Sequence, residues 1–197
     1  MPATDEPDRS PMPPMEAEDQ PPPSTGTPAG STPIEIHLVD ASDALDPNEL
    51  NDLRALTQRV LALLPNSGSV RIRVVNDDEM IEAHTRFCEI DTTTDVLTFD
   101  LAPCDSGFES KVLDIDLIIC ADEARRQATA YAHPIAHELT LYIVHGILHC
   151  LGYDDHDEEE YTRMHAKEDE LLNAAGIGAV FMPAPENNPT PTQEHHS

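Results

Sequence analysis

The segment PIAHELTLYIVHGILHCLG, residues 134–152, constrains the fold of this chain more than any other. It is mostly apolar over a length typical of a helix, and a helix with so few polar positions is buried in a protein core. Pro134 suits the first turn of such a helix and Gly152 suits its end. The segment also carries His145 and His149. Because burying two imidazoles without a partner is costly, we expect a central helix whose histidines share a ligand.

The segments around this helix predict an α+β fold with a mixed sheet of about four strands. Alternating apolar and polar residues predict the strands, and apolar residues at helical spacing predict the helices. The strands are expected within residues 34–40, 69–77, 92–101 and 113–124. The helices are expected at 46–64, 77–88, 121–132, 134–152 and 158–175. Asp46 is expected to cap the first helix, and Asp77 or Asp78 the second. The helix that carries the histidines should pack against the sheet.

Composition divides the chain into one domain and two tails. Residues 1–33 hold 10 of the 18 prolines and almost no large aliphatic side chains, and residues 183–197 have a similar composition. Such segments cannot bury enough apolar surface to offset the entropy lost on ordering, so both are predicted to be disordered. Residues 34–182 remain as a single domain that is large enough to hold its own core.

Three features predict a cytoplasmic protein. No run of about 18 apolar residues is present, so neither a membrane span nor a membrane partner is expected. The first residues, MPATDEPDRSPMPP, lack the basic and apolar regions of a signal peptide. The four cysteines are far apart and form no C-x-x-C pair, which favours reduced thiols.

The chain is strongly acidic, with 38 acidic and 11 basic residues and a net charge of −27. The tails account for only part of this, because residues 34–182 keep 30 acidic and 10 basic residues, a net charge of −20. Sequence-independent binding to nucleic acid depends on Lys and Arg neutralising phosphates. The charge therefore argues against loose binding to RNA, and no role on DNA is expected. A small cleft dominated by a metal and a few arginines is still compatible with it.

His145 and His149 are four residues apart, which places both side chains on one face of the helix with Cβ atoms roughly 5–6 Å apart. Gly152 then releases the chain from the helix, and either Asp155 or His156 follows as a third ligand. Three protein ligands leave an open position, as in catalytic zinc sites. A zinc ion at such a site lowers the pKa of its bound water to about 7. The pattern predicts one catalytic Zn²⁺.

The spacing also resembles the extended zinc motif of metzincin proteases, H-E-x-x-H-x-x-G-x-x-H. Those enzymes need Glu directly after the first histidine as a general base, and this chain has Gly146 there. Glu138 occurs in AHELT, but no histidine stands at position 141 to complete a protease motif. These differences argue against a protease, and a metal-dependent hydrolase of another bond, with a peptide bond still included, is kept only as the alternative prediction.

Three separated motifs resemble those of the YbeY family of bacterial endoribonucleases. They are HGILHCLGYD at 145–154, TDVLTF at 94–99 and DLIIC at 116–120. They keep the family's order and spacing, and the resemblance runs from about residue 69 to residue 176. It implies an endoribonuclease that uses one metal ion, usually zinc, to cut phosphodiester bonds in single-stranded RNA. It further implies a role in rRNA maturation (16S rRNA 3′ end processing) and in ribosome quality control, with the ribosome or a ribosomal protein as partner.

This chain departs from the family pattern in two places. The family's third ligand is a His one residue after the Asp of G-Y-D. That register gives Asp155, whereas His156 is the better zinc donor, so both are candidates. The family also carries an arginine before the T-D-V-L strand, which suits binding of the scissile phosphate. Cys88 holds that place here, and Arg86, two residues earlier, is the candidate for the catalytic role.

The pattern identifies no general base. A third interpretation is a ribosome-associated factor without catalytic activity, which keeps the metal for stability. The charge of the domain favours this interpretation, because strong binding to RNA alone is not expected. Docking through a protein partner on the ribosome would remove the objection to an RNA-cutting enzyme.

Overall fold

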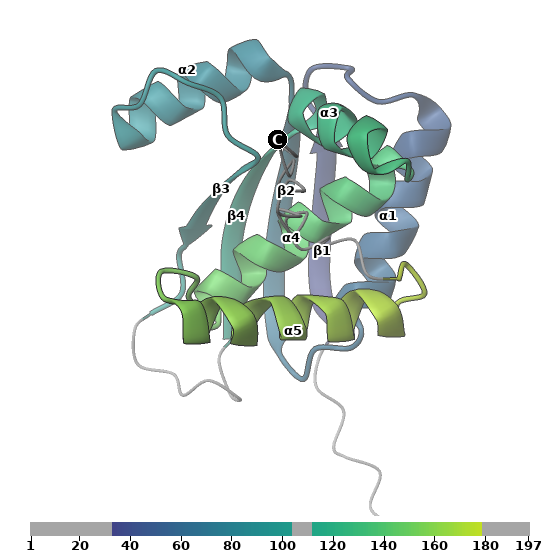
Figure 1. The fold of residues 1–197 in the computed structure, drawn as a ribbon, viewed down its shortest axis with the longest axis vertical. Coiled ribbons are helices and arrows are strands. Elements are labelled where there is room, and N and C mark those ends of the chain that lie inside the picture. Colours follow the sequence, from purple (N-terminus) through teal and green to yellow (C-terminus); the bar gives the residue numbers. More distant parts are fainter. Residues whose placement is uncertain (1–32, 104–111, 179–197) are drawn as a thin grey trace, which may run out of the picture. The chain divides into compact units, whose positions relative to one another are not determined.

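The structure is a computed structural model that describes residues 33–103 and 112–178 (Figure 1). The elements in chain order are β1 (Ile34–Asp40), α1 (Pro47–Leu61), β2 (Ser67–Val75), α2 (Asp77–Cys88), β3 (Val96–Asp100), β4 (Val112–Cys120), α3 (Ala121–Tyr131), α4 (Ile135–Cys150) and α5 (Glu158–Ala174). The two segments predicted to be disordered lie outside the described residues, apart from Pro33. Their disorder and the domain limits 34–182 stay predictions.

The four strands form one mixed sheet in the order β1-β2-β4-β3. β2 runs parallel to β1 and to β4, whereas β3 pairs with β4 in the antiparallel direction. This arrangement confirms the predicted α+β class and the mixed sheet of about four strands. β3 is therefore an edge strand, and it lies beside the helix that carries the two histidines (Figure 1).

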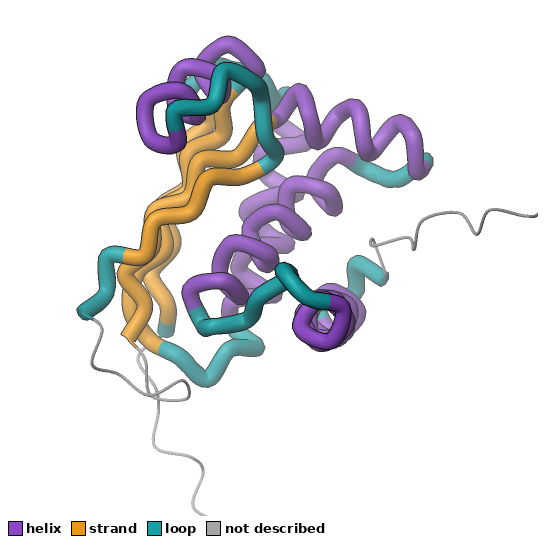
Figure 2. Tube along the Cα trace, turned by 60° about the vertical axis from the view of Figure 1, so that its left-hand side comes forward, coloured by secondary structure: helices purple, strands orange, loops and turns teal. Residues whose placement is uncertain are grey.

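Helices α1, α3, α4 and α5 lie on one side of the sheet, with α4 between the sheet and α5 (Figures 1 and 2). Ile143 and Ile147 of α4 are each 1% exposed and belong to the same core cluster as Leu117 and Ile119 of β4. Burying side chains of this size contributes about 1.5–3 kcal/mol each. The prediction that the histidine helix packs against the sheet is confirmed. Because one face of α4 is buried in this core, the positions of His145 and His149 on the helix are fixed relative to the sheet.

Two helix caps were predicted from the sequence, and one of them is wrong. Asp46 caps α1 as predicted, and its backbone N–H in turn donates to the Glu49 carboxylate at 2.9 Å, which completes a capping box. The cap of α2 is Asn76, whose Oδ1 accepts the Glu79 N–H at 3.0 Å, and neither Asp77 nor Asp78. β2 ends at Val75, two residues before the predicted end, so Asn76 is left to cap the helix and Asp77 is available for a tertiary contact.

That contact links α2 to α3. The Asp77 carboxylate accepts from both terminal nitrogens of Arg126 at 2.7 and 2.9 Å, and from the Thr93 hydroxyl at 3.2 Å. The guanidinium of Arg126 holds the pKa of Asp77 down, to about 2, against the opposing effect of burial. Asp77 thereby ties the loop before β3, where Thr93 lies, to both helices.

We expect Asp77→Asn to remove a pH-dependent part of the stability. Because the folded pKa lies below the unfolded one, the stabilisation is fully present above about pH 4 and is lost as the pH falls towards 2. About half of the Arg126 side chain is exposed, so solvent screening limits the effect to about 1 kcal/mol. Urea unfolding of both proteins at pH 6 and pH 2.5 should show this difference at the higher pH only. An equal difference at both pH values would contradict the assignment.

Candidate metal centre

His145 and His149 lie on the last two turns of α4, and their rings approach each other edge to face. The ring centroids are 4.5 Å apart at an angle of 90°, and the two Nε2 atoms are 3.1 Å apart. One ligand atom from each histidine and one carboxylate oxygen of Asp155 all lie within 4.8 Å of one another. Side chains from a helix and from the loop that follows it therefore meet at one point.

The end of α4 returns the chain towards these histidines. Gly152 adopts a φ of 85°, in the left-handed region that favours glycine, directly after the helix. The N–H groups of Gly152 and Tyr153 donate to the carbonyls of His149 and Leu148, each at 3.0 Å. This compact turn reverses the chain, and Asp155 lies three residues beyond Gly152.

Both histidines present Nε2 to the shared point because Nδ1 is already used. His145 Nδ1 lies 2.8 Å from Glu168 Oε1, and His149 Nδ1 lies 3.2 Å from the Tyr153 carbonyl oxygen. Each partner is an acceptor, so each ring carries its proton on Nδ1 and turns the Nε2 lone pair towards the other ring. Two Nε2 atoms bound to one tetrahedral zinc at 2.0–2.1 Å would be about 3.3 Å apart. The observed 3.1 Å fits this donor arrangement.

Glu168 of α5 orients His145 from behind. Its side chain is fully buried, and its second oxygen pairs with Nδ1 of His165, one turn earlier on α5. Burial alone would lower the pKa of His145, but the hydrogen bond to Glu168 and the charges of Asp95 and Asp155 raise it above its ordinary value. A carboxylate on the outer nitrogen of a ligating histidine fixes the ring and strengthens it as a ligand.

The role of Glu168 was not predicted, although the sequence contains a signal for it. Glu168 lies among the apolar positions of α5, and Met164, Leu171 and Leu172 on the same face pack against Val144 and Leu148 of α4. A carboxylate on the buried face of an amphipathic helix needs a partner. Naming His145 as that partner requires the packing of α5 on α4, which the periodicity does not give.

Gly146 faces the sheet rather than the metal-binding group. A Cβ atom there would lie 2.6 Å from the Thr98 hydroxyl oxygen and 2.8 Å from a methyl carbon of Leu117. Metzincin-type proteases hold their catalytic Glu at this position. Here α4 packs so closely on β3 and β4 that the position has no room for a side chain. This geometry strengthens the argument against protease chemistry that was drawn from the sequence.

Gly146→Ala should therefore destabilise the protein, because the added methyl group forces α4 away from β3. We expect a loss of about 1–3 kcal/mol in the free energy of unfolding, as for other overpacked core positions. Chemical denaturation in the presence of a chelator measures this loss without a contribution from metal. Adding Thr98→Ala in the same chain should restore part of it. A Gly146→Ala protein as stable as the parent would show that α4 is not held at this distance.

The other two sequence candidates lie outside this group. The His156 side chain is 83% exposed; it pairs with Asp154, and its Nδ1 is 3.9 Å from Asp155 Oδ1. Arg86 is exposed in the last turn of α2, with its guanidinium carbon 5.4 Å from the centre of the Phe87 ring. Among the described residues, Arg86 is not one of those that line the cavity at His145.

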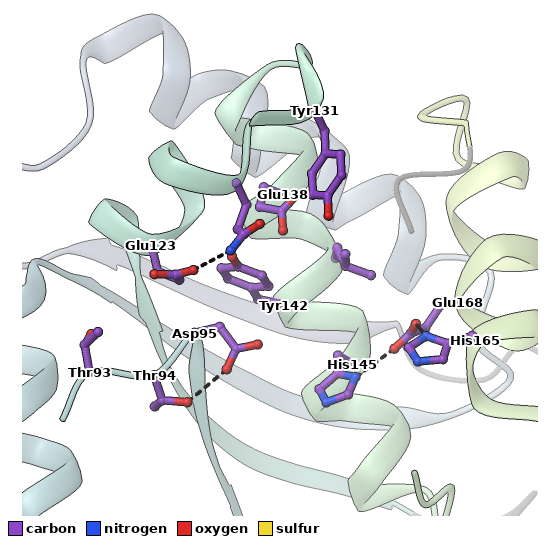
Figure 3. A pocket seen from close by; sticks show the side chains of 12 residues that line it. Thr93, Thr94, Asp95, Glu123, Tyr131, Glu138, Tyr142, His145, His165 and Glu168 are labelled. Carbon is purple, nitrogen blue, oxygen red and sulfur yellow. Dashed lines mark hydrogen bonds and ion pairs between the residues drawn. The ribbon is translucent and has the colours of Figure 1, made fainter. Parts of the chain in front are cut away.

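A cavity of about 470 Å³ opens beside His145. It runs between the loop before β3, helix α3 and the inner face of α4, with His165 and Glu168 of α5 at the same end as His145 (Figure 3). Asp95 also lines it, and Thr94 Oγ1 and the Val96 N–H both donate to its Oδ1. The metal-binding group therefore adjoins a space large enough for a small organic ligand.

Comparison with known proteins gives one consistent family. A model of that family, described as Endoribonuclease YbeY, matches residues 40–176. This chain belongs to the YbeY family. Curated YbeY endoribonucleases are similar over most of its length: 33% identity with the protein of Carboxydothermus hydrogenoformans, over 71% of this chain and 96% of that one, and 29% identity with that of Corynebacterium glutamicum, over 77% and 83%. The protein of Bacillus licheniformis is 31% identical over 72% of this chain and 95% of its own.

Membership in the YbeY family confirms the resemblance drawn from the three sequence motifs, and with it the predicted enzyme class, a hydrolase of RNA phosphodiester bonds. The group of His145, His149 and Asp155 is a possible metal site, as expected for a family of metalloenzymes.

Within the described residues, no helix is both long enough and apolar enough to cross a membrane. A solution structure from Thermotoga maritima also matches, with a TM-score of 0.42 and 22% identity over 78% of this chain and 98% of that one, which is too loose to place individual residues.

Proposed function

We propose that this protein is a zinc-dependent endoribonuclease that cuts single-stranded RNA in rRNA maturation. The single observation that carries the proposal is the convergence of His145, His149 and Asp155 beside an open cavity, in a chain of the YbeY family. We assign the metal to these three residues. His156 is left out because its ring is exposed and pairs with Asp154.

The donor set suits a divalent ion that acts without redox chemistry. Two neutral imidazoles and one carboxylate are ordinary zinc ligands, and three protein ligands leave a position open. When bound, such an ion polarises a phosphodiester and activates water for attack. No change of oxidation state is required for hydrolysis, which favours zinc among the metals that bind two histidines and a carboxylate.

The residues of the chain would hold the reacting groups in place. Glu168 keeps His145 in the tautomer that turns Nε2 forward, and Asp155 offsets the positive charge of the ion. The cavity beside His145 would receive the RNA. Arg86 stays our candidate for binding the scissile phosphate, and its position at the end of α2 would require the RNA to pass from the cavity towards that helix.

The net charge of the domain bears on how RNA reaches this site. A charge of −20 opposes RNA binding driven by the phosphate backbone alone. We therefore propose that the enzyme acts in the cytoplasm and docks on the ribosome through a protein partner. Processing of the 16S rRNA 3′ end and ribosome quality control belong to this proposal.

The proposal is tested with three substrates and the purified full chain loaded with zinc. An end-labelled single-stranded RNA should be cut internally, the same RNA in a duplex should be cut at least about tenfold more slowly, and an unstructured peptide should stay intact. His149→Ala should abolish RNA cleavage. Cleavage of the peptide with intact RNA would favour the alternative hydrolase. Zinc-loaded protein that cuts neither substrate would favour the factor without catalytic activity.

A further inference from the structure

The cavity beside the candidate metal centre has a second end, on the far side from Glu168. Glu138 and Tyr142 project from α4 into it, and Tyr131 of α3 lies at its rim (Figure 3). Glu138 precedes His145 by seven residues on α4, which corresponds to about 10 Å along the helix axis. A group of nucleotide size attached to a phosphate at the metal centre can therefore reach this end.

Apart from the hydroxyls of Tyr131 and Tyr142, the side chains at this end offer mainly hydrogen-bond acceptors. Within the described parts of the chain, the two donors to Asp95 both end on Oδ1, so Oδ2 can accept from a further donor. The amide nitrogen of Gln127 donates to Glu123 at 2.6 Å, which turns the Gln127 carbonyl oxygen the other way. A ligand at this end must bring its own N–H groups to satisfy these oxygens.

Two further polar groups at this end are deeply buried. Glu138 is 6% exposed, with one carboxylate oxygen 3.1 Å from His133 Nε2, and burial raises its pKa. Tyr142 is 5% exposed, and its hydroxyl lies beside the Glu138 carboxyl group, but it is in good hydrogen-bond geometry with no described residue. Buried polar groups without full hydrogen bonding are costly and are usually explained by a ligand or an ordered water.

Charge excludes a phosphate from this end. Among the residues that line the cavity, none is a Lys or Arg, whereas Asp95 and Glu123 carry carboxylates. A phosphate brings negative charge and acceptors only, so it would meet repulsion and leave the acceptors of the cavity unsatisfied. An uncharged ring with N–H donors on one edge meets neither obstacle.

We propose that this end of the cavity is a nucleobase subsite that prefers bases with an amino group on the Watson–Crick edge, next to the scissile phosphate. The inference rests on the proposed endoribonuclease function. Guanine fits best, because its N1–H and N2 amino group are adjacent donors that match carboxylate and amide oxygens. Cytosine and adenine offer one amino group, whereas the single N3–H donor of uracil is flanked by two carbonyl oxygens that the subsite repels. Tyr131, about half exposed at the rim, supplies an aromatic face against which an unpaired base can stack.

The test maps the cleavage sites in an unstructured RNA library by sequencing the product ends, with the zinc-loaded full chain. The parent protein should show one position, fixed relative to the cut, at which amino-bearing bases exceed uracil by about tenfold. Glu138→Gln replaces one of the two carboxylate oxygens by an NH₂ donor and should reduce this ratio to about twofold or less. Gln127→Ala, at a position only partly buried, repeats the test if Glu138→Gln folds poorly. Glu170→Gln, an exposed carboxylate on α5, is the matched control and should keep the full ratio.

A second substrate pair isolates one amino group. Guanosine and inosine differ only in the N2 amino group. The parent protein should cut an RNA with inosine at the favoured position several-fold more slowly than the same RNA with guanosine there. Glu138→Gln should cut the two RNAs at equal rates. Cleavage without a base preference, or with a preference that Glu138→Gln leaves unchanged, would overturn the subsite. Absence of any RNA cleavage by the parent protein would instead overturn the proposed function.

Discussion

Asp155→Ala should lower the affinity of the protein for zinc by about 100-fold or more, whereas His156→Ala should leave it within about threefold. Asp155 supplies one of the three ligand atoms that converge within 4.8 Å, and a two-histidine site without it lacks both a ligand and a compensating negative charge. His156 points to solvent and pairs with Asp154. Competition with a zinc-binding dye at pH 7.5 measures both variants under the same conditions.

The two variants form a matched pair because they change neighbouring loop residues. Removal of either side chain alters the loop to a similar extent, so a general loosening of the loop would weaken zinc binding in both. Loss of zinc in His156→Ala alone would show that the loop rearranges and delivers the stronger donor. Asp155 would then be the residue left outside the site.

Glu168→Ala should impair both metal binding and stability. Without Glu168, Nδ1 of His145 and Nδ1 of His165 lose a buried acceptor, and an unsatisfied buried group costs about 1–3 kcal/mol. His145 also loses the hydrogen bond that orients its ring, and outer partners of this kind are worth about 10–100-fold in metal affinity. Urea unfolding in chelator and zinc titration of the folded protein separate the two effects.

Controls on α5 make this prediction specific. Glu168→Gln keeps an acceptor oxygen of the same size and should lose less affinity than Glu168→Ala, and Glu170→Gln should behave as the parent does. If Glu168→Ala bound zinc as tightly as the parent protein, His145 would not depend on its hydrogen bond to α5.

The parts of the fold set by local sequence could be predicted well. The capping box of Asp46 and Glu49 involves residues three apart, and the spacing of His145 and His149 on α4 follows from helix geometry. The mixed sheet was expected because its strands carry clear period-two or fully apolar patterns. These features depend on neighbours along the chain, so their signals lie within a few residues.

Features that depend on packing between distant segments could not be predicted. The cap at Asn76 follows from where β2 ends, and that end is fixed by pairing with β1 and β4. The sequence offered both Asp155 and His156, since the direction of each side chain after Gly152 is set by the turn and not by the order of residues. Glu168 needed the contact of α5 with α4, 23 residues away from His145.

We propose that one metal ion, held by the histidines of α4, is required for RNA cleavage. The most direct test is the cleavage rate of a labelled single-stranded RNA as zinc is added to protein stripped with chelator. We expect no cleavage without metal, full activity at one zinc per chain, and no recovery in His149→Ala at the same zinc concentration. Cleavage by the stripped protein, or by His149→Ala at the rate of the parent, would contradict the account.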